Sequence, residues 1–88
     1  MITTTTAHDA ASRAAALFLS TLSVTDRPTY AEVAAAIDGA LRRHGGGRGC
    51  AADVAAAFGD HPELAAPRMR WALRLVESVY QPAVLIAA

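Results

Sequence analysis

Apolar side chains recur at intervals of three or four residues along most of the chain, which is the spacing of one face of an α-helix. In the N-terminal part, the apolar residues at this spacing are Ala11, Ala15, Phe18 and Leu22. Thr6 and Asp9 lie before this stripe, and their side chains can cap the start of a helix. The pattern predicts a first helix over residues 7–22 and a disordered N-terminal tail over residues 1–6.

The clearest helix start lies further along, where Thr29 and Glu32 have the spacing of a capping box. The apolar residues that share one face after this start are Tyr30, Val33, Ile37 and Leu41. Basic side chains fill the last turn, and Gly45 is a residue type that ends helices in the left-handed conformation. A second helix is therefore predicted over residues 30–44.

The glycine-rich segment over residues 45–49 is predicted to be a flexible connector. It follows a helix and lacks the Gly-Lys-Ser/Thr ending of a phosphate-binding loop, so we do not expect it to hold a nucleotide. A third helix is predicted over residues 50–58, ended by Gly59. Its expected buried residues are Val54, Ala55 and Phe58.

Asp60 and Glu63 form another start signal, which predicts a short helix over residues 61–66. Pro67 lacks an amide hydrogen and clashes with the preceding turn, so a break or a kink is expected there. A last helix is predicted over residues 68–80. Its apolar side carries Met69, Ala72, Leu73, Val76, Val79 and Tyr80, and its polar side carries Arg70, Arg74 and Glu77.

These elements predict an all-α fold, a compact bundle or orthogonal packing of four to five short helices in one domain over residues 7–81. Alanine is the commonest residue, so the helices must pack closely through small side chains. We expect the helices at 30–44, 50–58 and 68–80 to form the core. An apolar C-terminal tail is predicted over residues 82–88.

Composition limits the function classes. Eight arginines, no lysine and eight acidic residues give a formal net charge of zero, which argues against attraction of the whole surface to nucleic acid or acidic lipid.

Cys50 is the single cysteine, so no intramolecular disulfide can form, and a cytoplasmic location is expected. The apolar run over residues 14–24 is too short to cross a bilayer and precedes no signal-peptide cleavage site, so no membrane association is expected.

Cys50 with His44 or His61 is the only candidate pairing of a nucleophile and a base. A lone cysteine at the head of an alanine-rich helix is more typical of a buried apolar residue. The spacings of these three residues match no zinc motif. We therefore predict no catalytic residue, metal site, cofactor or small-molecule substrate, and thus no enzyme.

Residues 52–74 carry the most specific motif, in which an acidic, aliphatic and alanine-containing run leads through a glycine to an arginine-bearing helix. The matching positions are Asp53, Val54, Ala55, Phe58, Gly59, Arg68, Met69, Ala72 and Arg74. The segment resembles the helix-turn-helix in region 4 of bacterial sigma factors and in related response regulators. The resemblance implies a second helix in the DNA major groove, with phosphate or base contacts by Arg68, Arg70 and Arg74. Residues 42–74 hold six arginines against three acidic residues, and this local positive charge predicts backbone contacts by Arg42, Arg43 and Arg48.

Trp71 is expected beside Leu75 at the edge of the apolar face of the last helix. A half-exposed tryptophan flanked by arginine is typical of a protein interface, although a chain with few large side chains can also use its only tryptophan in the core. With the tail residues Val84, Leu85 and Ile86, Trp71 and Leu75 indicate a surface for a protein partner or a homodimer. The leading interpretation is a non-enzymatic regulatory or accessory module; the alternative is DNA binding through the arginines.

Overall fold

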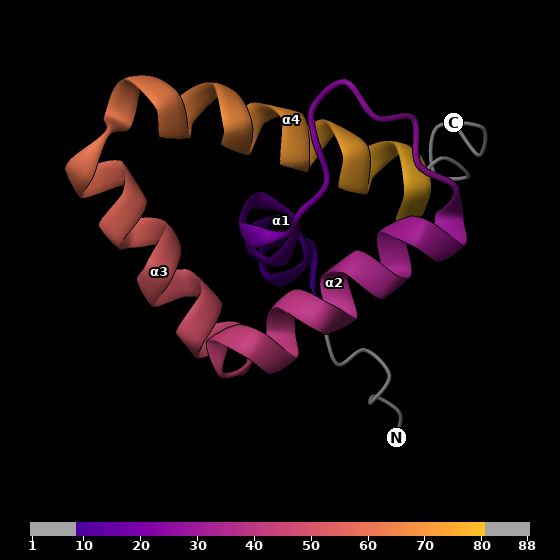
Figure 1. Cartoon of the computed structure of the whole chain (residues 1–88), viewed down its shortest axis with the longest axis horizontal. Coiled ribbons are helices and arrows are strands. Elements are labelled where there is room, and N and C mark those ends of the chain that lie inside the picture. Colours follow the sequence, from indigo (N-terminus) through magenta and orange to yellow (C-terminus); the bar gives the residue numbers. More distant parts are fainter. Residues whose placement is uncertain (1–8, 81–88) are drawn as a thin grey trace.

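The computed structural model describes residues 9–80, which form four helices and no strand. The helices are α1 (Ala10–Leu19), α2 (Tyr30–His44), α3 (Gly46–Asp60) and α4 (Pro62–Tyr80). Figure 1 shows α1 nearly end-on, with α2, α3 and α4 enclosing it on three sides. This arrangement confirms the all-α class. The predicted tails at 1–6 and 82–88 lie outside the described residues.

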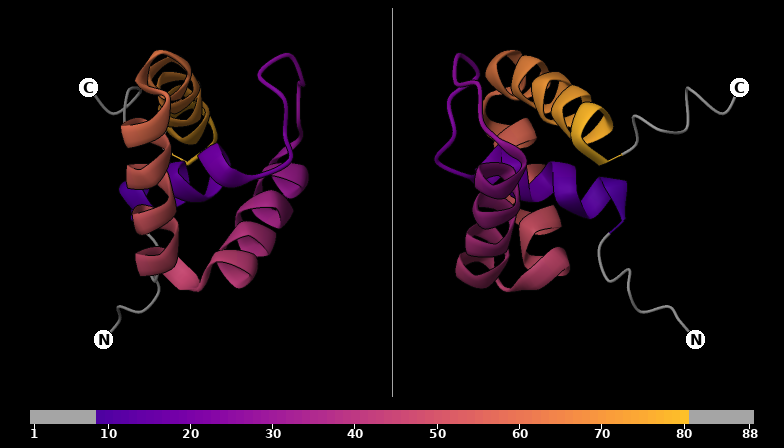
Figure 2. Two further views of the ribbon diagram at one scale, coloured as in Figure 1. Left: turned by 60° about the vertical axis from the view of Figure 1, so that its left-hand side comes forward. Right: turned by 90° about the vertical axis from the view of Figure 1, so that its right-hand side faces the viewer.

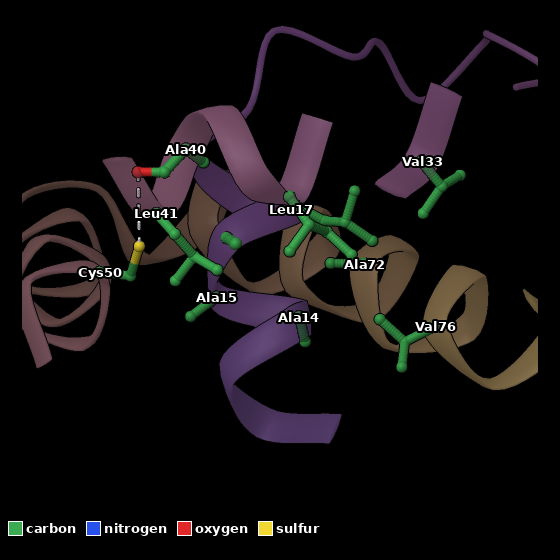
Figure 3. Packing of buried hydrophobic residues seen from close by; sticks show 11 residues of the cluster. Ala14, Ala15, Leu17, Val33, Ala40, Leu41, Cys50, Ala72 and Val76 are labelled. Carbon is green, nitrogen blue, oxygen red and sulfur yellow. Dashed lines mark hydrogen bonds between the residues drawn. The ribbon is translucent and has the colours of Figure 1, made fainter. Parts of the chain in front are cut away.

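The core is built around α1, contrary to the prediction that the three later helices form it. Four consecutive residues, 14–17, are buried, so α1 is covered all round. Such burial is possible because three of the four are alanines, whose small side chains let neighbouring helices approach closely. The other helices each contact α1 and supply Val33, Cys50 and Val76, which are fully buried in the same cluster (Figure 3).

Helix α1 is shorter than predicted, because it ends at Leu19 and Leu22 lies beyond it. At its start, a carboxylate oxygen of Asp9 accepts a 2.8 Å hydrogen bond from the Ser12 amide. At its end, the Ser20 hydroxyl donates a 2.7 Å hydrogen bond to the Leu17 carbonyl. A connection over residues 20–29 then leads to α2.

Helix α2 has the predicted bounds. The Thr29 hydroxyl accepts a 3.1 Å hydrogen bond from the Glu32 amide, and the Glu32 carboxylate accepts a 2.8 Å bond from the Thr29 amide. Gly45 follows with φ of 82°, in the left-handed region. The predicted capping box and helix-ending glycine are both confirmed.

Helix α3 begins within the glycine-rich segment that was expected to be a flexible connector, and it extends to Asp60 instead of residue 58. Gly45 and Gly46 both have positive φ, which reverses the chain at the end of α2. Gly49 then lies against that end, and a Cβ atom there would stand 1.5 Å from the His44 carbonyl oxygen. Of the predicted buried residues of α3, Val54 and Phe58 are half-buried and Ala55 is exposed.

Of the break or kink expected at Pro67, the break does not occur, because α4 is one helix through that position. Pro67 stands in the second turn, and the carbonyl it leaves without a helical amide belongs to Glu63, on an exposed part of the helix. Asp60 ends α3 and does not cap a helix over 61–66 as predicted. Ala65, Ala72 and Val76 are the buried residues of α4.

Candidate protein-docking site

Arg68 of α4 closes the C-terminal end of α1. Its guanidinium donates to the carbonyl oxygens of Phe18 (2.9 Å), Leu17 (3.3 Å) and Ser20 (3.1 Å). The last carbonyls of a helix lack amide partners and carry partial negative charge, so a cation there is favoured. Partial burial lowers the pKa of Arg68 from its ordinary high value, and arginine nevertheless remains charged at neutral pH.

The same guanidinium lies 4.4 Å from the centre of the Trp71 ring. Trp71 is half-buried and packs against the core cluster with its inner part. Because three carbonyls hold Arg68 in place, the ring that stacks on it is also restricted. Trp71 is thus a positioned aromatic side chain at the surface, which costs little conformational entropy when a partner binds.

Trp71 lines an open groove of about 520 Å³, and we call this surface the Trp71 groove. Its lining residues are Val24, Leu64, Pro67, Arg68, Trp71 and Arg74. Leu64 is 67% exposed and Val24 is 52% exposed, although both are large apolar residues. Two exposed aliphatic side chains beside a half-buried tryptophan form an apolar patch without a cover among residues 9–80.

A second apolar cavity of about 400 Å³ continues the groove toward the junction of α3 and α4. It shares Leu64 and Arg68 with the Trp71 groove and adds Phe18 and Ala57. The ring of Phe18 stacks on that of Phe58 with a centroid distance of 6.1 Å, which ties this end of α1 to α3. The apolar surface therefore extends along the N-terminal half of α4.

The structure places only some of the predicted interface residues at the Trp71 groove. Trp71 lines the groove, whereas Leu75 is half-buried against the core cluster and does not line it. Val84, Leu85 and Ile86 lie outside the described residues. The sequence analysis did not predict Leu64 or Val24 as part of this surface. Leu64 precedes Trp71 by seven residues, a spacing that puts both side chains on one face of a helix and could have identified Leu64. No local sequence pattern places Val24 beside α4.

The arginines predicted to contact DNA lie in two groups. Arg42, Arg43 and Arg48 belong to the corner between α2 and α3, and Figures 1 and 2 show this corner and α4 on opposite sides of α1. Arg42 pairs with Asp38 one turn before it. Arg70 and Arg74 are exposed on α4, and within residues 9–80 Arg74 makes no ion pair with Glu77. The guanidinium of Arg68 donates its hydrogen bonds to carbonyl oxygens at the end of α1.

Among residues 9–80, no hydrogen bond joins the Cys50 thiol to His44 or His61. Cys50 is fully buried, with its Sγ atom 3.8 Å from the Ala40 carbonyl oxygen (Figure 3), and burial raises the pKa of its thiol. His44 pairs through Nδ1 with Asp53 at 2.7 Å, across the α2–α3 corner. His61 is exposed near Glu63. Within the described chain, no three side chains of the histidine, cysteine, aspartate and glutamate types gather as metal ligands do.

A cavity of about 660 Å³ lies between the 20–29 connection and α2, lined by two acidic and two basic side chains. Its carboxylates have local roles, because Asp26 accepts from the Ser23 amide at 2.8 Å and Glu32 caps α2. Arg27 and Arg43 complete the charged lining. With both charges present, the lining favours no single class of charged ligand.

Over residues 9–80, no helix combines the length and the apolar character needed to cross a membrane. Comparison of the chain with protein-family models, with curated proteins and with solved structures finds no match.

Proposed function

We propose that the chain is a non-enzymatic regulatory or accessory module that binds an amphipathic helix of a protein partner in the Trp71 groove. The observation that carries this proposal is the position of Trp71, restrained by Arg68 and bordered by the exposed side chains of Leu64 and Val24. Tryptophan in such a setting is a frequent anchor of protein interfaces.

The shape of the surface favours a helix as the bound element. Leu64, Pro67, Trp71 and Arg74 follow one another at intervals of three or four residues, so the groove runs along about three turns of α4. A second helix laid alongside presents apolar residues at the same intervals. The half-exposed apolar side chains would then lose their contact with water, which favours binding.

The charged residues at the two ends of the groove favour one direction of the bound helix. Arg74 lines the groove and Arg70 is exposed on the same helix, whereas Asp60 borders the adjoining cavity at its other end. A bound helix with an acidic and a basic end in the complementary order would be preferred over the reverse.

DNA binding through a helix-turn-helix is the alternative prediction, and the geometry supports it less. Arg68 donates to three carbonyls of α1, and the arginines of the α2–α3 corner lie on the other side of the molecule from Arg70 and Arg74. A single residue, His61, separates α3 from α4. Binding to a duplex would have to use one arginine group at a time.

The proposal is tested by selecting binders to the immobilised full chain from a display library of random amphipathic helical peptides. We expect enriched peptides with apolar residues at positions i, i+3 or i+4, and i+7. Their binding should be lost with Leu64→Arg and kept with Leu73→Arg, because Leu73 is a 48% exposed leucine of the same helix that does not line the groove.

Circular dichroism of both variants would establish that α-helix content is retained. Failure to enrich any peptide with a chain that is monomeric under the selection conditions, or equal binding to the wild type and to the Leu64→Arg chain, would overturn the docking function.

A further inference from the structure

We infer that the helix bound in the Trp71 groove is α4 of a second copy of this chain, paired antiparallel across a two-fold axis near Pro67. This inference rests on the proposed docking function and names its partner. It follows from the order of apolar and charged residues along one stripe of α4, and from the place of α4 at an outer edge of the molecule (Figures 1 and 2).

The stripe is self-complementary in shape. Leu64 projects into solvent at one end of the Trp71 groove, and Trp71 lines the same groove seven residues further along α4, or about 10 Å at the rise of an α-helix. A two-fold axis midway between Leu64 and Trp71 exchanges the two positions. Leu64 of each copy then packs beside Trp71 in the groove of the other, as an isologous interface requires.

Pro67 occupies the centre of this stripe. Its side chain is a short ring without a charged or flexible end, and the residue is exposed. Two helices can approach closely where such a residue meets its own copy. No bulky or charged side chain of the groove lining lies at the proposed axis between Leu64 and Trp71, apart from Arg68, which is directed to the carbonyls of α1.

Charge decides the direction of pairing. Glu63 stands in the first turn of α4 and Asp60 at the end of α3 just before it, whereas Arg70 and Arg74 stand after the centre of the stripe. Within the described residues, Asp60, Arg70 and Arg74 make no ion pair. Antiparallel copies place the arginines of each helix beside the acids of the other, whereas parallel copies oppose like charges.

The composition of the core favours the same partner. Half of the buried apolar residues are alanines, so a single copy buries little large apolar surface. A second copy covers Leu64 and Val24 and extends the core at the groove. The chain thereby supplies both members of the interface from one sequence.

The inference is tested by sedimentation velocity of the full chain from about 1 µM to about 1 mM at low salt. We expect a reversible monomer–dimer equilibrium with a dissociation constant in the micromolar range, as for a small interface. Leu64→Arg should weaken dimerisation by at least about tenfold, and Leu73→Arg, the matched control, should leave it within about twofold of the wild type.

Charge reversal tests the direction. Arg74→Glu and Glu63→Arg should each weaken the dimer about three- to tenfold, and the chain carrying both should recover most of the loss, because the reversed charges meet again in an antiparallel pair. A double variant weaker than either single variant would overturn the antiparallel arrangement.

The two proposals fail separately. A chain that is monomeric at about 1 mM, or a dimer unaffected by Leu64→Arg, overturns the self-pairing. If such a chain still selects helical peptides through Leu64, the docking function stands with a different partner. If it selects none, both proposals are wrong.

Discussion

Arg68 and Phe18 stand fifty residues apart in the sequence and are joined by a 2.9 Å hydrogen bond from the guanidinium Nε to the main-chain carbonyl oxygen. This bond, with two others from the same guanidinium, ends α1 and fixes α4 against it. Because Arg68 also stacks on Trp71, the closure of the central helix and the shape of the candidate docking site depend on one side chain.

Replacing Arg68 should therefore affect both stability and the environment of Trp71. We expect Arg68→Ala to lower the free energy of unfolding by about 2–3 kcal/mol, because carbonyls at the end of α1 lose a charged donor. Arg68→Lys should lower the free energy of unfolding by a smaller amount, because the lysine ammonium keeps the positive charge but cannot donate to all three carbonyls. Urea denaturation, followed by the fluorescence of the single tryptophan, measures both effects.

In the Arg68→Ala chain, the folded-state emission of Trp71 should move to longer wavelength as its ring becomes more mobile and hydrated. Unchanged stability together with an unchanged emission maximum would show that Arg68 does not support this part of the fold.

Gly49 should be the most sensitive glycine of the α2–α3 corner. A Cβ atom at this position would stand 1.5 Å from the His44 carbonyl oxygen, so Gly49→Ala forces the first turn of α3 away from the end of α2. We expect a loss of about 2–4 kcal/mol in the free energy of unfolding, measured by thermal or urea denaturation.

Gly59→Ala is the matched control on the same helix, because nothing lies within 4 Å of a Cβ atom there. Alanine should stabilise this helical position by about 0.5–1 kcal/mol. Equal effects of the two substitutions would contradict the close approach at Gly49.

The thiol of Cys50 should react slowly in the folded protein. It is fully buried, and burial raises its pKa, so both access and thiolate formation are disfavoured. Labelling with a disulfide reagent at about pH 8 should be at least about a hundredfold slower than in denaturing urea, where Cys50 is released from the core. Rapid labelling without urea would mean that the contacts between α1, α2 and α3 open readily.

The Asp9 cap should give α1 a measurable dependence on pH. Hydrogen bonds from Ser12 lower the pKa of Asp9 in the folded state, so its contribution to stability is present above the unfolded-state pKa and is lost as pH falls through the lowered value. The melting temperature of the wild type should therefore exceed that of Asp9→Ala at about pH 6, and the difference should shrink toward about pH 2. A difference that is constant over this range would exclude the charged cap.

The helix-turn-helix alternative has a direct test in fluorescence anisotropy with random-sequence duplex DNA. With zero net charge and its arginines divided between two sides of α1, the chain should show no binding below about 100 µM at about 50 mM salt. Salt-sensitive binding that is weakened by Arg70→Glu and Arg74→Glu, with helix content retained, would favour the DNA-binding prediction over the docking function.

Local signals in the sequence determined α2 almost completely. Thr29, Glu32 and Gly45 act within one turn of the helix ends, so their spacing predicts the same bounds that the fold adopts. The helical spacing of α4 likewise places Ala72 and Val76 inside and Arg70 and Arg74 outside, whereas Leu73, predicted on the apolar side, is 48% exposed. The sequence also placed Trp71 correctly at the edge of the apolar face.

Tertiary contacts decided the rest. The start of α3 among glycines depends on the approach of Gly49 to the end of α2, and α4 continues through Pro67, whose lost backbone bond falls on an exposed turn. The same applies to Arg68, which the motif of residues 52–74 predicts as a DNA contact but the fold turns onto the carbonyls of α1.

The candidate site shows this division most clearly. The seven-residue spacing of Leu64 and Trp71 is readable from the sequence, but Val24 reaches the groove only because α1 ends at Leu19 and the 20–29 connection passes beside α4. Spacing along a helix is a local property that the chain carries in any context. The meeting of residues about fifty positions apart exists only after α1 is buried among the other helices, because that packing brings them within contact distance.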